Sequence, residues 1–259
     1  MYNENNILKI YFDCEFTGLH KNNQLISIAL ISENFDVFYA ERNDLNYKLL
    51  SEPNVIIDDN DVLISDFVRD NVVDNLLFNN LKKCQISLTE EQVKDLNIPL
   101  LQTLESYKDS FQNISRKLNA WLEKINKDNK QIQFYCDCGY FDTVLLIDLI
   151  TNSGSSLDLP DNISYIPVDL CTVLQLNNYD PDMDRNQIIL SKELHNQLNI
   201  SGVIDKIYKI SDFIKALFLY ILSFTSNPTS FRILHHNSLF DAIIIMEYFI
   251  ILLNHPRNL

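Results

Sequence analysis

The stretch Ile7–Ser32, ILKIYFDCEFTGLHKNNQLISIALIS, contains the pattern that decides the fold. Its first part, Ile7–Phe12, alternates and is rich in β-branched and aromatic side chains, which is typical of a β-strand. Leu25–Ser32 is apolar on both faces, as in a central strand that is covered on two sides. A third strand is expected at Phe35–Ala40, after a turn. We therefore expect the chain to open with a meander of three strands.

The rest of the chain mixes strand and helix patterns. Further strands are expected at Gln131–Asp137 and Ser164–Asp169, which brings the number of expected strands to five. Helices are expected, from apolar spacing, at Asp70–Lys82, Leu88–Asp95, Tyr107–Lys127, Tyr140–Ile150, Lys206–Ser226 and Leu239–Leu253. We find no internal repeat, and the length suits one α/β domain over residues 1–259.

Composition and charge limit the partners. The chain of 259 residues is 46% hydrophobic and 22% charged, as in an ordinary globular protein. Its formal net charge of −14 has the wrong sign for a protein that coats nucleic acid through counterion release. A nucleic-acid enzyme is still compatible with this charge, because carboxylates recruit divalent cations that contact phosphate. We therefore expect a substrate that is short or only transiently held.

Three features predict a cytoplasmic protein that does not contact a membrane. The start, MYNENNILKIYFD, lacks the basic and apolar segments of a signal peptide, and the five cysteines are expected to be reduced. The apolar runs Phe213–Phe224 and Ala242–Leu253 are shorter than the ~20 residues that a membrane span needs. We expect both runs to form buried helices.

Two carboxylates come directly after the first strand pattern. Asp13 and Glu15 are two residues apart, so a strand presents them on the same side. Carboxylates placed side by side repel each other unless a cation lies between them. A solvated strand end is the alternative interpretation.

Two further carboxylates lie at helix starts. Asp142 is in the first turn of a helix that follows a strand, and Asp241 begins the last helix. Each of them alone is explained by the helix dipole, which favours acids at this end. His236 precedes Asp241 by five residues, and its neighbour His235 is an alternative. Asp137, at the preceding strand end, is an alternative to Asp142.

Taken together, these residues predict a metal site. Carboxylates at strand ends and helix starts lie where ligand sites form in α/β proteins. Oxygen ligands suit Mg²⁺ or Mn²⁺, and a histidine supplies a base that titrates near neutral pH. These groups are the ones that two-metal hydrolysis of a phosphodiester requires.

Three segments resemble the motifs of the DEDDh 3′–5′ exonucleases. YFDCEFTG at residues 11–18 resembles the first motif, in which D-x-E is followed by threonine and glycine. YCDCGYFDTVLL at 135–146 resembles the second motif, an aspartate that enters a helix after a strand. HNSLFDA at 236–242 resembles the third motif in its histidine form, since Asn237 stands where the tyrosine form has its tyrosine.

The strands LISIALIS and FYAE resemble the hairpin of this family, and they look closest to mycobacterial-type and phage 3′–5′ exoribonuclease-like proteins. The resemblance covers roughly residues 7–41, 131–170 and 228–253. It implies a ribonuclease-H-like fold, a mixed five-stranded sheet flanked by helices. The segments at about 42–110 and 176–202 match nothing in the family and are expected to be insertions.

The resemblance also assigns roles to residues. It implies that Asp13, Glu15, Asp142 and Asp241 hold two divalent ions, Mg²⁺ or Mn²⁺. His236 is expected to deprotonate the attacking water. The residues that follow the first motif are expected to grip the terminal nucleotide, and they are Phe16, Thr17, Gly18 and Leu19. Stacking of Phe16 or Leu19 against a base would tolerate any sequence, although core packing is the alternative for Phe16.

The expected activity is the release of nucleoside monophosphates from the 3′ ends of single-stranded RNA. Two alternatives remain open, namely a DNA-directed 3′–5′ exonuclease of the proofreading or repair type and a catalytically inactive nucleic-acid-binding module. The intact carboxylates argue against the inactive module. A homodimer is expected from the resemblance alone.

Overall fold

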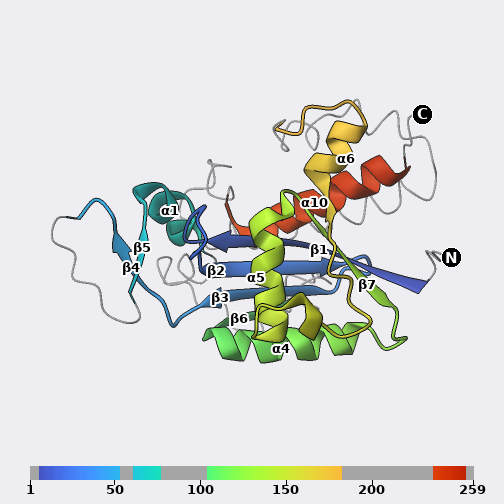
Figure 1. The fold of residues 1–259 in the computed structure, drawn as a ribbon, viewed down its shortest axis with the longest axis horizontal. Helices are drawn as coiled ribbons and strands as arrows, with labels where there is room; N and C mark the ends of the chain where they lie inside the picture. The colour runs from blue at the N-terminus through green and yellow to red at the C-terminus, as the bar shows by residue number, and fades with distance from the viewer. Residues whose placement is uncertain (1–5, 53–60, 77–103, 183–235, 255–259) are drawn as a thin grey trace, which may run out of the picture.

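A computed structural model of the chain describes residues 6–52, 61–76, 104–182 and 236–254 (Figure 1). Within these residues, the centre is a six-stranded mixed sheet with the strand order β6-β3-β2-β1-β7-β8. Its strands are β1 (Ile7–Phe16), β2 (Leu25–Ser32), β3 (Val37–Arg42), β6 (Leu104–Asp109), β7 (Gln131–Cys136) and β8 (Val168–Asp169). β1, β2 and β3 form an antiparallel meander, whereas β6, β7 and β8 each run parallel to their inner neighbour.

Helices cover both faces of this sheet (Figure 1). One face packs against α6 (Leu170–Leu176) and α10 (Ser238–Asn254). The other face packs against α4 (Phe111–Ile125) and α5 (Gly139–Thr151). Among the described residues, no helix is both long enough and apolar enough to cross a membrane.

The two faces of β1 carry different residues, because side chains alternate along a strand. Tyr11 joins the core beneath α6 and α10, whereas Phe12 and Cys14 join the core beneath α4 and α5. Asp13 and Glu15 continue the series of Tyr11. The strand therefore directs both carboxylates toward the α10 face.

A smaller unit lies beside the end of β1. It contains the parallel strands β4 (Asn46–Leu49) and β5 (Asp61–Ile64), the short helix α1 (Asp66–Asn71) and the 3₁₀ turn η2 (Val73–Asn75). Ser65 caps α1 by accepting a hydrogen bond from the Val68 amide at 3.2 Å. Val68 is buried in a separate hydrophobic cluster that includes Ile26 of β2. This unit is therefore packed directly against the central sheet.

Most expected elements are confirmed. The meander, the strand at 131–136 and the helices after Gly139 and Ser238 are present. The late apolar run Ala242–Leu253 lies in α10, where residues 242–246 and 248–250 are buried. The helices expected at 88–95 and 206–226 and the run 213–224 lie outside the described residues.

The expectation of five strands is wrong, because the sheet has a sixth strand within the described residues. β6 lies in the segment expected to be an insertion, and the helix expected from Tyr107 begins only at Phe111. β6 is an edge strand of sequence LESYKD, and its residues from Glu105 onward are half-buried. Such a strand needs no apolar run, so the sequence carries little signal for it.

Other boundaries also differ from expectation. β1 extends from Ile7 to Phe16, beyond the expected Ile7–Phe12, and β3 is Val37–Arg42 where Phe35–Ala40 was expected. The last strand was expected over Ser164–Asp169 but is limited to Val168–Asp169, because Pro167 has no amide hydrogen for a ladder. The helix expected at Asp70–Lys82 is replaced, as far as residue 76, by α1 and η2. Residues 77–82 lie outside the described part of the chain.

Candidate functional site

β1 and α10 bring three carboxylates together. Oxygen atoms of Asp13, Glu15 and Asp241 all lie within 4.8 Å of one another. Glu15 is buried, and the other two are half-buried. We call these three residues the carboxylate cluster. It joins Asp241 to two residues that lie more than 200 positions earlier in the sequence. This agrees with the expectation that carboxylates at a strand end and at a helix start meet.

The start of α10 is fixed by short contacts. The backbone amide of Asp241 donates to the Asn237 carbonyl at 3.0 Å, and the backbone amide of His236 donates to the Asp241 carboxyl. The hydroxyl groups of Ser27 and Ser238 are hydrogen bonded at 3.0 Å. Ser27 pairs with Glu15 across the β1–β2 ladder. The helix start is therefore tied to the strand next to the cluster.

Asp142 approaches from the other side of the sheet. It lies on α5 and accepts a hydrogen bond from the backbone amide of Cys14 at 3.2 Å. Its charge raises the pKa of Asp13, after the larger effect of burial. Asp142 is therefore adjacent to the carboxylate cluster, although it lies outside the three-residue group within 4.8 Å.

Asp137 also borders the cluster. Its charge raises the pKa of Asp13 and of Asp241, in both cases after the effect of burial. The Cys171 thiol donates to an Asp137 carboxyl oxygen at 3.5 Å. Asp142 is the more buried of the two aspartates and is held by β1 itself. Both residues therefore remain candidates for the second-motif ligand, and this geometry favours Asp142.

The acidic groups destabilise each other when they are charged. Burial, followed by the neighbouring carboxylates, raises the pKa of Asp13 and Glu15 well above its ordinary range. The same causes raise the pKa of Asp142 to about 7 and that of Asp241 to about 8. A divalent cation among them would offset the repulsion, and oxygen donors suit Mg²⁺ or Mn²⁺. The residues present fit such a metal.

His236 lies two residues before the start of α10. It is exposed, its backbone is left-handed with φ of 59°, and its ring meets the ring of Phe67 edge to face at 5.4 Å. Its backbone contact with Asp241 places it beside the cluster. His235, the alternative, lies outside the described residues.

The four residues expected to grip a nucleotide have different surroundings. Thr17 is buried and closes the β1–β2 turn, because its hydroxyl accepts from the Gln24 amide at 2.9 Å. The Phe16 ring is half-buried against that of Phe141 at 5.6 Å, which agrees with partial core packing. Gly18 is half-buried, and Leu19 is 78% exposed. Leu19 is therefore the most accessible of the four.

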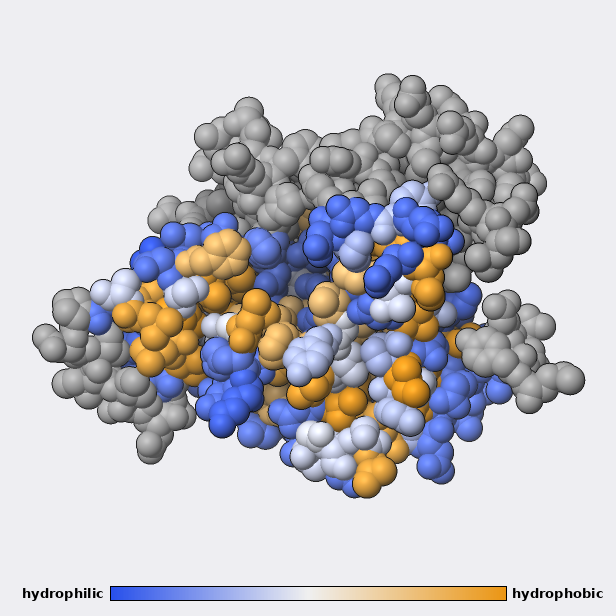
Figure 2. All heavy atoms as spheres, turned by 45° about the horizontal axis from the view of Figure 1, so that its top comes forward, coloured by the Kyte–Doolittle hydropathy of each residue, from blue (hydrophilic) through white to orange (hydrophobic). Residues whose placement is uncertain are grey.

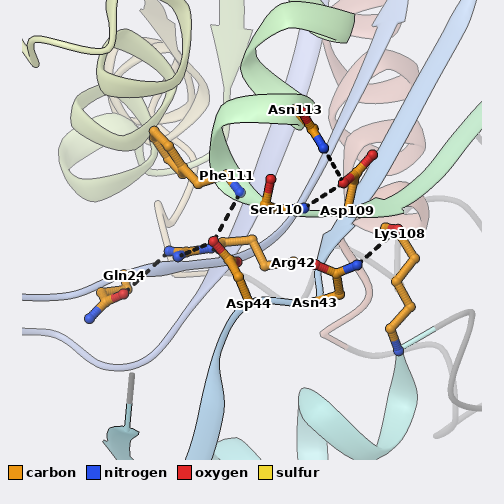
Figure 3. Close-up of polar contacts among 9 residues, drawn as sticks. All are labelled: Gln24, Arg42, Asn43, Asp44, Lys108, Asp109, Ser110, Phe111 and Asn113. Carbon is orange, nitrogen blue, oxygen red and sulfur yellow. Dashed lines mark hydrogen bonds and ion pairs between the residues drawn. The ribbon is translucent and has the colours of Figure 1, made fainter. Parts of the chain in front are cut away.

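A polar network holds the β1–β2 turn against the end of β3 (Figure 3). Arg42 pairs with Asp44 at 2.8 Å and donates to the Gln24 side chain at 3.3 Å. Asp44 also accepts from the backbone amide of Phe111, the first residue of α4, at 3.1 Å. The turn that follows the first motif is therefore fastened to the start of α4.

Sequence reasoning missed two residues near the site. Phe67 lies in a segment without a recognisable motif, and only its contact with His236 reveals it. Glu41 is fully buried, pairs with Ser27 across the β2–β3 ladder and accepts from the Tyr39 hydroxyl at 2.6 Å. The position of Glu41 at the end of a strand pattern was the one available signal. In the motif comparison, Glu41 is only the last residue of the hairpin strand FYAE.

A scan against protein-family models and a search of curated proteins both give no match to this chain.

Proposed function

We propose that this chain is a divalent-metal-dependent 3′–5′ exonuclease that releases nucleoside monophosphates from single-stranded RNA. The observation that carries the proposal is the carboxylate cluster, whose oxygen atoms lie within 4.8 Å of one another beside Asp142. The mixed sheet with helices on both faces is compatible with a ribonuclease-H-like fold, which we infer for the chain. The preference for RNA rests on the motif resemblance.

The residues would divide the work as follows. Asp13, Glu15 and Asp241, with Asp142 beside them, would hold Mg²⁺ or Mn²⁺, two ions in all. Bound cations would polarise the phosphodiester and stabilise the charge on the leaving oxygen. His236 would accept the proton of the attacking water at a ring nitrogen, since a neutral imidazole is available near pH 7.

The acidic surface agrees with a substrate that is held at its end. A net charge of −14 repels a long polyanion, so affinity has to come from the metal site and from contacts to the terminal nucleotide. We propose single-stranded nucleic acid as the partner, with RNA preferred over DNA. The homodimer and the cytoplasmic location stay predictions.

The test is a gel assay. End-labelled single-stranded RNA and DNA of one sequence are incubated with Mg²⁺ or Mn²⁺, and we expect a metal-dependent ladder from the 3′ end, stronger on RNA. Asp13→Asn should abolish the ladder. Asp128→Asn is the matched control, because it removes an exposed carboxylate far from the site. Asp128 lies in the turn before β7, whereas the carboxylate cluster is near the end of that strand.

The outcomes separate the alternatives. A stronger ladder on DNA would replace the RNA preference by the DNA-directed exonuclease. Cleavage that persists in Asp13→Asn would overturn the assigned site. Binding of oligonucleotide without cleavage of either strand would support the inactive binding module.

A further inference from the structure

An exposed aromatic ring lies next to His236, the proposed general base. Phe67 of α1 is 58% exposed, and its ring meets that of His236 at 5.4 Å with an interplanar angle of 77°. The backbone amide of His236 is bonded to Asp241 of the carboxylate cluster. Phe67 therefore contacts the proposed general base directly and is one residue removed from the carboxylate cluster.

The scaffold fixes the position of Phe67. Its neighbour Val68 is buried with Ile26 of β2, and the next residue of that strand, Ser27, is hydrogen bonded to Ser238 at 3.0 Å. One strand thus positions both α1 and the turn that carries His236. The contact between the two rings follows from this arrangement of elements.

A second aromatic group lies on the α5 side of the site. Phe141 packs against Phe16 at 5.6 Å and against Tyr140 at 5.0 Å. α1 and the start of α5 flank the end of β1 in Figure 1. Figure 2 shows hydrophobic surface at the left, over β4, β5 and α1, next to hydrophilic surface. Aromatic rings therefore lie both beside His236 and at the start of α5, next to Asp142.

The charge near Phe67 restricts what it can contact. Asp66 and Asp70 flank it on α1, and both pair with Arg69, so this turn carries a net negative charge. Phosphate groups are repelled there. The face of a nucleobase is uncharged, and it stacks on an aromatic ring whatever the sequence of the nucleic acid. The favoured contact of Phe67 is therefore with a nucleobase of the substrate.

We propose that Phe67 is a nucleotide-binding residue whose ring stacks on the nucleobase at the 3′ end of the substrate. This inference rests on the proposed exonuclease function. It assigns a role in substrate binding to a segment that has no motif. Stacking on Phe67 requires a nucleobase at the 3′ end but depends little on which nucleobase it is.

The test measures binding separately from cleavage. Fluorescent RNA oligonucleotides that end in an ordinary or an abasic 3′ nucleotide are titrated by anisotropy, with Ca²⁺ in place of Mg²⁺ so that binding is read before turnover. We expect Phe67→Ala to weaken binding of the ordinary end about tenfold and to leave the abasic end unchanged. Phe67→Tyr should restore binding.

Leu50→Ala is the matched control, because Leu50 is 63% exposed in the same unit. It should bind both oligonucleotides as the wild type does, and the Mn²⁺-induced rise in Tm should be equal in all variants. Equal affinity of Phe67→Ala and wild type, or an equal loss on both ends, would overturn the role of Phe67. A wild type that neither binds nor cleaves would overturn the proposed function itself.

Discussion

Asp241 has two properties that one substitution can separate. Asp241→Asn keeps the acceptor for the His236 amide but removes the negative charge. We expect cleavage to fall about 100-fold or more, because a proposed metal ligand is lost. We also expect the metal-free variant to have a higher Tm than wild type at pH 8, since burial disfavours the charged carboxylate.

The gel assay measures the cleavage by Asp241→Asn, and thermal unfolding with and without Mn²⁺ measures its Tm. The Mn²⁺-induced rise in Tm should shrink along with the activity. Full activity in this variant would remove Asp241 from the site. A lower Tm in the metal-free state would show that the aspartate has a structural role instead.

His236 should affect the rate without affecting metal binding. General base catalysis contributes about 10²–10⁴-fold, so His236→Ala should lose most of the cleavage rate. Its Mn²⁺-induced rise in Tm should equal that of wild type, because the variant keeps the backbone amide that bonds to Asp241. His235→Ala should be mild by comparison. The reverse ranking in a single-turnover assay would make His235 the base.

At the level of residues, sequence spacing predicted which acidic groups form the site but not what surrounds them. The i, i+2 rule placed Asp13 and Glu15 on one face, and helix starts suggested Asp142 and Asp241. The rule could not show that Asp142 enters from the opposite face and meets the Cys14 amide. Phe67 was beyond sequence reasoning, because its place depends on the packing of Val68 against another strand.

Among the elements, α4 depends on a distant cap. Ser110 precedes the helix without a side-chain capping bond, and Asp44 accepts from the Phe111 amide instead. Asp44→Ala removes this acceptor and the partner of Arg42, so we expect the free energy of unfolding to fall by about 1–2 kcal/mol. Asp44→Asn keeps the acceptor and should lose less.

Urea denaturation of the two Asp44 variants measures the difference. Equal losses would assign the effect to the charge pair with Arg42, and no loss in either variant would show that the cap contributes nothing. The Mn²⁺-induced rise in Tm should stay as in wild type, because Asp44 lies outside the carboxylate cluster.

The elements that sequence patterns predicted well are those with a clear apolar signal. β2 is buried along its whole length, as LISIALIS indicated. β6 gave no such signal, because its half-buried residues pair on one side only, with β3. Its assignment depends on tertiary pairing, in which Tyr107 packs against Phe38 at 5.6 Å. Local sequence cannot reveal such a strand.

On the scale of the whole molecule, the fold gathers buried and half-buried acids from β1, α5 and α10 into a place where no described lysine or arginine pairs with them. Stability should therefore depend on pH and on metal together. Unfolded carboxyl groups ionise near pH 4, whereas burial raises the pKa of Asp142 to about 7 and that of Asp241 to about 8.

A raised pKa in the folded state means that the folded chain keeps protons that the unfolded chain has already released. The resulting stabilisation is fully present below about pH 4 and is lost as pH rises to about 8. With EDTA, the free energy of unfolding should therefore fall between pH 5.5 and pH 8.5. With Mn²⁺ the fall should be much smaller, because the cation stabilises the charged carboxylates.

Urea denaturation at both pH values, with EDTA or Mn²⁺, measures this coupling. The general repulsion of a chain with net charge −14 also grows with pH, so a control is needed. The double variant Asp13→Asn/Asp241→Asn keeps most of that general repulsion but lacks two of the clustered acids. Its stability in EDTA should change less with pH than that of wild type, and it should gain little from Mn²⁺. Parallel curves for the two proteins would mean that the buried acids do not control the stability, and the metal site would lose its main physical support.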